Sequence, residues 1–287
     1  MNDTIRIGGV PEHFNLPIHQ AIEKGNFAAK GMDMEWTTFK GGTGQMTRAL
    51  RNDEVDVCIL LTEGIIADII KGNAAKIISL YIKTPLIWGV HTGVDNELDN
   101  YQDIFNAQYA ISRFGSGSHL MAIVDANSKD KRIIKEQFTV IKNLKGALQS
   151  LAEQETDVFY WEKFTTKPYV DKGLLRRIGE YHTPWPCFVV AATQKVINEK
   201  PEQLTRMLRT IHESCDQFMI HGDESIAEVS ERYQQKPKDV ERWFHNTEWS
   251  THGWVSDKMT HAVVYNLKTA GIIAADQVIP ELIWKRN

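Results

Sequence analysis

Short apolar runs alternate with amphipathic stretches along the first two thirds of the chain. Strand character is found at Thr4–Val10, Met34–Phe39, Val55–Leu61, Lys76–Ile82, Leu86–Thr92, Tyr109–Arg113, Gln137–Ile141, Asp157–Tyr160 and Leu174–Ile178. Helical periodicity lies between most of these runs, and from Gln194 onward the pattern is almost wholly helical. Strands separated by helices form largely parallel sheets with the helices packed on their faces. The pattern therefore predicts an α/β fold.

Two segments have the character of connections between lobes. Thr84–Asn96 contains a proline, a glycine and an Asp-Asn pair, and Tyr181–Phe188 contains Thr-Pro-Trp-Pro-Cys-Phe. They bracket a central insert, and the βα pattern continues on both sides of each segment. We therefore expect a discontinuous lobe 1, residues 1–88 and 188–287, and an inserted lobe 2, residues 89–187. A cleft between two such lobes is a preferred place for a ligand.

A glycine-serine turn is the most distinctive chemical feature of the sequence. The strand that ends at Arg113 is followed by Phe-Gly-Ser-Gly-Ser-His and then by an amphipathic helix. Such a turn brings backbone N–H groups and the hydroxyls of Ser116 and Ser118 close to a ligand, and the positive end of the helix dipole favours an anionic group there. The same residues are equally typical of a serine N-cap with a glycine for chain reversal. The turn predicts either a small-ligand cradle or a simple helix start.

Several motifs together resemble the type II periplasmic-binding-protein fold. They are the opening Gly9–Pro17, the turn Gly41–Gly44, the stretch Asn52–Ile59 and the turn Gly115–His119. A further segment, Lys24–Met34, matches the glycine and apolar spacing that follows the first helix in that family. Within the family, the chain is similar to the branch that binds nitrate, alkanesulfonates, taurine and thiamine-pyrimidine precursors.

This resemblance implies a two-lobed clamp with a mostly parallel, helix-covered sheet in each lobe and a cleft that closes on a small solute. In lobe 1, loop residues after the strands would line the cleft: Glu12, His13, Gly42, Thr43, Gly44, Thr62 and Glu63. Trp185 lies on the return crossing and would face the cleft from there. In lobe 2, the glycine-serine turn and a later strand end would contribute Arg113, Ser116, Ser118, His119, Trp161 and Glu162.

Most of these residues also have a purely structural interpretation. Glu63 fits the first turn of a helix, where the dipole favours an acidic side chain, and the tryptophans fit core or hinge packing. If the residues do face a ligand, Arg113 and the two serines suit a carboxylate, sulfonate or phosphate, whereas the glutamates suit an amine or an amidine-like heterocycle. A zwitterionic or amino-heteroaromatic ligand would satisfy both groups, with tryptophans stacked on its ring.

Composition narrows the classes of partner. The chain has 42% apolar and 24% charged residues and a net charge of -4, which suits a folded core and gives no basic patch for nucleic acid or acidic membrane. The three cysteines, Cys58, Cys187 and Cys215, are too widely spaced for a disulfide framework or a zinc site. We therefore expect no cofactor, no metal and no nucleic-acid partner.

The sequence also bears on the membrane and on the compartment. No stretch approaches the ~20 apolar residues of a membrane helix, so we expect no direct membrane insertion. The start of the chain has no signal-peptide pattern. The sequence predicts a soluble protein that is cytoplasmic as the sequence stands, or periplasmic or otherwise extracytoplasmic if a signal peptide was removed.

The resemblance implies binding of a small polar or heteroaromatic solute in the interlobe cleft. The expected role is the substrate-binding component of an ABC-type uptake system, with a permease as partner. Gly-x-Ser-x-Gly, His-Glu-x-x-His and P-loop motifs do not occur in the sequence, which favours a protein that is not an enzyme. Two alternatives stay open: a cytoplasmic enzyme of the same fold, similar to lyases of menaquinone biosynthesis, and a ligand sensor.

Overall fold

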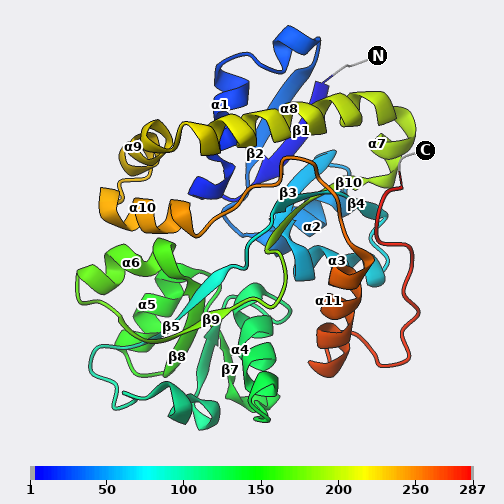
Figure 1. Cartoon of the computed structure of the whole chain (residues 1–287). Helices are drawn as coiled ribbons and strands as arrows, with labels where there is room; N and C mark the ends of the chain where they lie inside the picture. Colours follow the sequence, from blue (N-terminus) through cyan, green and yellow to red (C-terminus); the bar gives the residue numbers. More distant parts are fainter. Residues whose placement is uncertain (1–3, 286–287) are drawn as a thin grey trace. The chain divides into compact units, whose positions relative to one another are not determined.

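The computed structural model describes residues 4–285, which fold as two compact units (Figure 1). Unit 1 contains the chain up to Thr84, Trp185–Val264 and the residues from Asp276 onward, and unit 2 contains Pro85–Pro184 and Tyr265–Ala275. At both crossings this division lies within a few residues of the expected lobe limits. The C-terminal stretch differs, because residues 265–275, which the sequence assigned to lobe 1, lie in unit 2.

Unit 1 is built on a five-stranded mixed sheet. Its strands, in spatial order, are β2 (Asp33–Thr38), β1 (Thr4–Gly9), β3 (Val57–Leu61), β10 (Phe188–Thr193) and β4 (Ala75–Ile82). β1 is parallel to both of its neighbours, whereas β10 is antiparallel to β3 and to β4. Four strands therefore run in one direction, as predicted, and one runs in the opposite direction. The central strand β3 is almost continuously apolar because helices cover both faces of the sheet.

The helices of unit 1 follow the strand ends and make up most of its C-terminal part. They are α1 (Leu16–Glu23), α2 (Thr43–Arg51), α3 (Thr62–Ile70), α7 (Gln194–Glu199), α8 (Pro201–Ile220), α9 (Gly222–Arg232), α10 (Pro237–His245) and the first part of α11 (Asp257–Thr269). α2 and α3 pack next to β3 and β10, while α1 lies beside the long helix α8 (Figure 1). The helical character predicted from Gln194 onward is confirmed by α7 to α11, and the strand β10, which directly precedes Gln194, was not predicted.

Unit 2 has a second five-stranded sheet of the same design. Its strands, in spatial order, are β7 (Phe138–Val140), β6 (Tyr109–Ile111), β8 (Val158–Glu162), β5 (Ile87–Thr92) and β9 (Arg176–His182). β6 is parallel to β7 and β8, and β5 is antiparallel to β8 and β9. The covering helices are α4 (Gly117–Ser128), α5 (Leu144–Ala152) and α6 (Lys163–Asp171). Four short 3-10 helices complete the two units: η1 (His13–Asn15), η2 (Ala28–Lys30), η3 (Tyr101–Asn106) and η4 (Lys135–Gln137).

The carboxyl edge of each sheet is where the candidate residues lie. In unit 1, β1, β2 and β3 lead into η1, α2 and α3, and in unit 2, β6 and β8 lead into α4 and α6. Polar connections at the carboxyl ends of parallel strands are the usual ligand-binding positions of α/β sheets. Because β10 runs in the opposite direction, its preceding residues, Trp185–Cys187, reach the same edge of unit 1.

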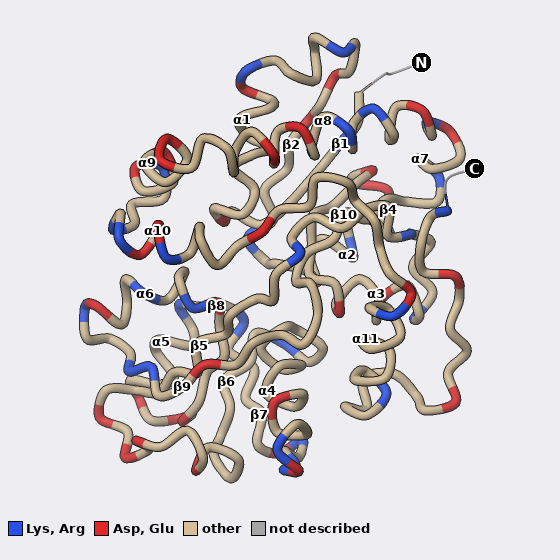
Figure 2. The backbone as a smooth tube through the Cα atoms, in the orientation of Figure 1, with Lys and Arg blue, Asp and Glu red and all other residues tan. Residues whose placement is uncertain are grey.

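Charge is balanced locally in both units. Figure 2 shows lysine and arginine interspersed with aspartate and glutamate along the chain. Arg6 pairs with Asp56 at 2.7 Å, and Arg51 pairs with Asp68 at 2.9 Å. Across residues 4–285, the helices are either too short or too polar to cross a membrane.

Candidate functional site

The first turn of α3 is fixed by the segment that precedes β10. The backbone N–H of Thr62 donates to the Cys187 carbonyl at 3.0 Å, and the Thr62 hydroxyl donates to the Pro186 carbonyl at 2.6 Å. A third hydrogen bond runs from the indole N–H of Trp185 to Oε2 of Glu63 at 2.9 Å. The structure thus brings together three predicted site residues, Thr62, Glu63 and Trp185, all of which are buried.

Glu63 is the most unusual side chain of this edge. It is 1% exposed, and its second carboxyl oxygen, Oε1, has no hydrogen-bond partner among the described residues. Burial raises the pKa of Glu63 to about 7, although the hydrogen bond from Trp185 favours the ionised form. An unsatisfied buried polar atom costs about 1–3 kcal/mol, so this oxygen is a natural place for a donor from another molecule.

The turn before α2 lies against the same part of α3. Gly42 has a φ of 64°, a left-handed conformation that glycine adopts without strain, and it precedes Thr43 and Gly44 in the first turn of α2. The methyl carbon Cγ2 of Thr43 is so near Gly64 that a Cβ on Gly64 would lie 2.3 Å from it. The predicted residues of this turn are therefore neighbours of the α3 start.

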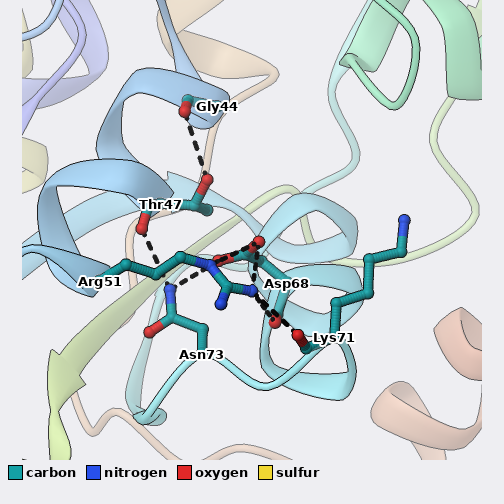
Figure 3. Close-up of polar contacts among 6 residues, drawn as sticks. All are labelled: Gly44, Thr47, Arg51, Asp68, Lys71 and Asn73. Atoms are coloured by element: carbon teal, nitrogen blue, oxygen red, sulfur yellow. Dashed lines mark hydrogen bonds and ion pairs between the residues drawn. The ribbon is translucent and has the colours of Figure 1, made fainter.

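A polar network fixes α2 against α3. Figure 3 shows Asp68 between Arg51 and Asn73. The Arg51 guanidinium donates to both Asp68 carboxylate oxygens, and the Asn73 amide donates to Asp68 at 2.6 Å and to the Thr47 carbonyl at 3.1 Å. The Thr47 hydroxyl in turn donates to the Gly44 carbonyl at 3.4 Å. Because these charge-assisted bonds join the last residue of α2 to the C-terminal half of α3, they hold the two helices against each other.

His13 lies in an aromatic environment rather than in a solvated turn. It is buried, its ring lies 4.1 Å from the ring of Trp243 and 5.0 Å from that of Phe14, and its Nε2 has no partner within residues 4–285. Burial lowers the pKa of His13 to about 3, so the imidazole is neutral near pH 7. Its neighbour Glu12 is half-buried. The neutral His13 ring is therefore part of an aromatic cluster inside unit 1.

The glycine-serine turn of unit 2 forms the helix start that the sequence offered as one interpretation. The Ser116 hydroxyl accepts the backbone N–H of His119, which makes Ser116 the N-cap of α4. The Ser118 hydroxyl accepts the backbone N–H of Ser112 at 3.1 Å, and Nδ1 of His119 accepts the backbone N–H of Gly115 at 3.1 Å. These polar groups therefore hold one another in place, and their part in ligand binding stays a prediction.

The other three residues predicted for lobe 2 differ in their surroundings. Arg113 is half-buried in the turn after β6, and its carbonyl accepts the backbone N–H of Ser116 at 3.1 Å. Trp161 is also half-buried and stacks on Phe159, with ring centres 5.1 Å apart. Glu162 is buried and caps α6, since its two oxygens accept the backbone N–H groups of the next turn at 3.0 and 2.6 Å. Each carboxyl oxygen of Glu162 thus has a hydrogen-bond partner, whereas only one oxygen of Glu63 has one among the described residues.

One buried polar residue of this edge was missed by the sequence analysis as a candidate. Asn15 donates from its amide to the Val10 carbonyl at 2.9 Å, and its Oδ1 has no partner in the described part of the chain. Asn15 lies just before a helix with proline in its first turn, a position typical of an N-cap, so the sequence pattern did not indicate that its side chain is buried. Within residues 4–285, no group of three or more His, Cys, Asp or Glu side chains is arranged to hold a metal ion.

Comparison with known proteins identifies the fold. A family model described as "Ca3427-like PBP" matches residues 88–181. Over its whole length the chain is similar to the CA3427 gene product of Candida albicans, a protein described as defining a new family with the generic periplasmic binding protein fold. The TM-score is 0.91 and the identity 27%, covering 99% of this chain and 98% of that one. The chain has the type II periplasmic-binding-protein fold.

Sulfonate-binding proteins share this fold. The alkanesulfonate-binding protein SsuA of Xanthomonas axonopodis pv. citri, solved with MOPS bound, has a TM-score of 0.82 and 12% identity, covering 98% of each chain. The periplasmic aliphatic sulphonate binding protein SsuA of Escherichia coli has a TM-score of 0.74 and 12% identity, covering 100% of this chain and 94% of that one. No curated protein matches the sequence. The predicted resemblance to this branch of type II periplasmic binding proteins is confirmed at the level of the fold.

Proposed function

We propose that the protein binds a small polar or heteroaromatic solute, as the substrate-binding component of an ABC-type uptake system. The fold supports this proposal, because several structures that share it are described as ligand-binding parts of sulfonate or other import systems. The same proposal assigns ligand contacts to the residues predicted from the sequence in both units.

One observation carries the proposal: the Glu63 carboxyl, which Trp185 holds at the carboxyl edge of the unit 1 sheet, has one oxygen with no partner in the described part of the chain. A protein that needed this group only for stability would gain by giving both oxygens a partner, as Glu162 has. A binding protein gains by leaving the oxygen for its ligand, since the ligand then removes the cost.

The chemistry of the titratable groups supports binding rather than turnover. His13 is a poor general base, because its pKa of about 3 leaves it little affinity for a proton. Burial raises the pKa of the Cys58 and Cys215 thiols, which disfavours a nucleophilic thiolate. One observation favours the enzymatic alternative, since a carboxyl such as Glu63 with a pKa of about 7 suits general acid–base chemistry.

The experiment is native mass spectrometry of the protein purified from its own host, followed by calorimetric titration with the compound that co-purifies. Arg113→Ala and Trp161→Ala should each weaken binding by about 1–3 kcal/mol, as expected for buried contacts at a binding hot spot. Arg132→Ala and Trp254→Ala, which alter an exposed arginine and an exposed tryptophan, are the matched controls. Unchanged affinity in both test variants, with folding intact, would show that the pocket lies elsewhere.

Two further measurements separate the proposed role from its alternatives. Chemical conversion of the co-purified compound by the protein alone would replace the binding role with an enzymatic one. Capture of a permease by the ligand-loaded protein would support uptake, whereas capture of a regulatory partner would support a sensor. An uptake receptor acts outside the cytoplasmic membrane, so recovery of the native protein in the cytoplasmic fraction of its host would contradict the transport role.

A further inference from the structure

Three buried polar atoms that have no partner among residues 4–285 lie in the connections that follow two adjacent strands of unit 1. They are Oε1 of Glu63 after β3, and Nε2 of His13 and Oδ1 of Asn15 after β1. β1 and β3 are hydrogen-bonded neighbours, with Gly8 opposite Cys58, so both connections leave the same edge of the sheet. Two of the three atoms, the carboxyl and amide oxygens, are hydrogen-bond acceptors in their usual state.

The surroundings of the Glu63 carboxyl act on its ionisation in opposite directions, because burial disfavours the charged form and two other contacts favour it. Trp185 donates to Oε2, and the residue lies in the first turn of α3, where the helix dipole favours a negative charge. Both effects favour the carboxylate, and burial opposes them. Among the described residues, no lysine or arginine contributes to the shift in this pKa, so the carboxyl is a positioned acceptor without a cationic partner there.

The position of the carboxyl is also rigid. The two hydrogen bonds from Thr62 to residues 186 and 187 fix the start of α3 to the segment that carries the indole. A rigid acceptor loses little entropy when a ligand binds, so its hydrogen bond contributes more fully to affinity and to discrimination between ligands.

The geometry points to Glu63 as the specificity-determining residue for a ligand that carries a cationic nitrogen with at least one N–H group, such as an amine or an amidine. The ligand nitrogen donates to Oε1 while Oε2 keeps the bond from Trp185. This inference rests on the proposed binding function and adds the chemical class of the group that unit 1 recognises. An anionic group at the same place would meet an acceptor and a like charge, which is unfavourable unless the carboxyl takes up a proton.

The experiment compares probes that differ only in the cationic N–H group. Benzamidine is paired with benzamide, and benzylamine is paired with benzyl alcohol. Binding of each probe to the full chain is measured by calorimetry at millimolar probe concentration. The pH is about 8.5, because the Glu63 carboxyl is ionised there. The cationic probe of each pair should bind about tenfold to a hundredfold more tightly, because a hydrogen bond to a charged group is stronger than a neutral one. Glu63→Gln should abolish that preference.

A matched control makes the same chemical change elsewhere. Glu248→Gln removes one negative charge from unit 1 at a half-exposed position that is paired with Lys83, and it should leave the preference intact. A preference that survives in Glu63→Gln, or that disappears equally in Glu248→Gln, would overturn the assignment to this carboxyl.

A second measurement uses the wild-type chain and so does not depend on the folding of a variant. The 13C resonance of the Glu63 carboxyl reports its ionisation, and benzamidine should lower the midpoint of its titration by about one pH unit or more. An unchanged midpoint in the presence of bound probe overturns the inference. If the cationic probes fail to bind while anionic or neutral solutes bind, the inference fails and the binding function stands; if no solute of any class binds, both fail.

Discussion

The buried Glu63 carboxyl should make the stability of the protein depend on pH in a way that one substitution removes. Its pKa rises from an ordinary 4.5 to about 7 in the folded protein, chiefly because burial disfavours the charged form. At about 1.4 kcal/mol for each pH unit between the two pKa values, the effect on the free energy of unfolding is about 3 kcal/mol.

The direction follows from proton binding. Between pH 4.5 and about 7, the folded protein holds a proton on this carboxyl and the unfolded chain has released it, so raising the pH favours unfolding. The stability that this group contributes is fully present below pH 4.5 and is lost as the pH rises through about 7. Glu63→Gln cannot titrate, so the variant lacks this decline while every other group titrates as before.

The assay is urea unfolding of the wild type and of Glu63→Gln at steps of about half a pH unit from about pH 4 to pH 8.5, with the free energies extrapolated to water. The wild type should lose about 3 kcal/mol relative to the variant across this range. Glu248→Gln, at a half-exposed surface position, serves as the control and should follow the wild type. A difference between wild type and Glu63→Gln that stays constant with pH would refute the reasoning, because the carboxyl would then have an ordinary pKa.

Three further outcomes are expected. His13→Phe should remove an acid sensitivity of about 5 kcal/mol, because a buried imidazole with a pKa of about 3 stabilises the fold above pH 6.5 and loses that contribution as the pH falls toward 3; urea unfolding against pH measures it. Gly64→Ala should destabilise by about 1–3 kcal/mol through overpacking against Thr43, and the added change Thr43→Ser should restore part of the loss in thermal unfolding; full additivity of the two changes would contradict the contact. Glu162→Ala should cost about 1–2 kcal/mol by removing the cap of α6, with hydrogen exchange increased in the first turn of that helix; unchanged exchange there would contradict the cap.

Local patterns predicted the elements of the fold well. Alternating and continuous apolar runs predicted nine of the strands, although β9 begins and ends later than expected, at Arg176–His182 instead of Leu174–Ile178. The strand β10 was not predicted, and only its first residue, Phe188, fell within the expected crossing, because six apolar or small residues before a helix have no periodicity of their own. The direction of each strand within its sheet was not predicted either, because the apolar pattern of one strand is the same whether its neighbours are parallel or antiparallel.

The candidate site was predictable only in part, because some of its residues are in contact although they lie far apart in the sequence. The loops at strand ends were found because chain order alone places them at the carboxyl edge. The bond between Glu63 and Trp185 joins residues 122 positions apart, and no local pattern encodes that pairing. The serine turn shows the opposite case, since its short-range signal for a cap was sufficient and the structure contains that cap.

The place of β10 in its sheet has a consequence for how the chain acquires its structure during synthesis. β10 lies between β3 and β4, yet it follows the whole continuous segment Pro85–Pro184 in the sequence. All five strands of the unit 2 sheet are present once His182 has left the ribosome. At that stage β3 and β4 still lack their shared neighbour β10, which begins at Phe188. The sheet of unit 2 is therefore complete first, and the nascent unit 1 has two apolar strand edges open to wrong pairing until β10 has been synthesised.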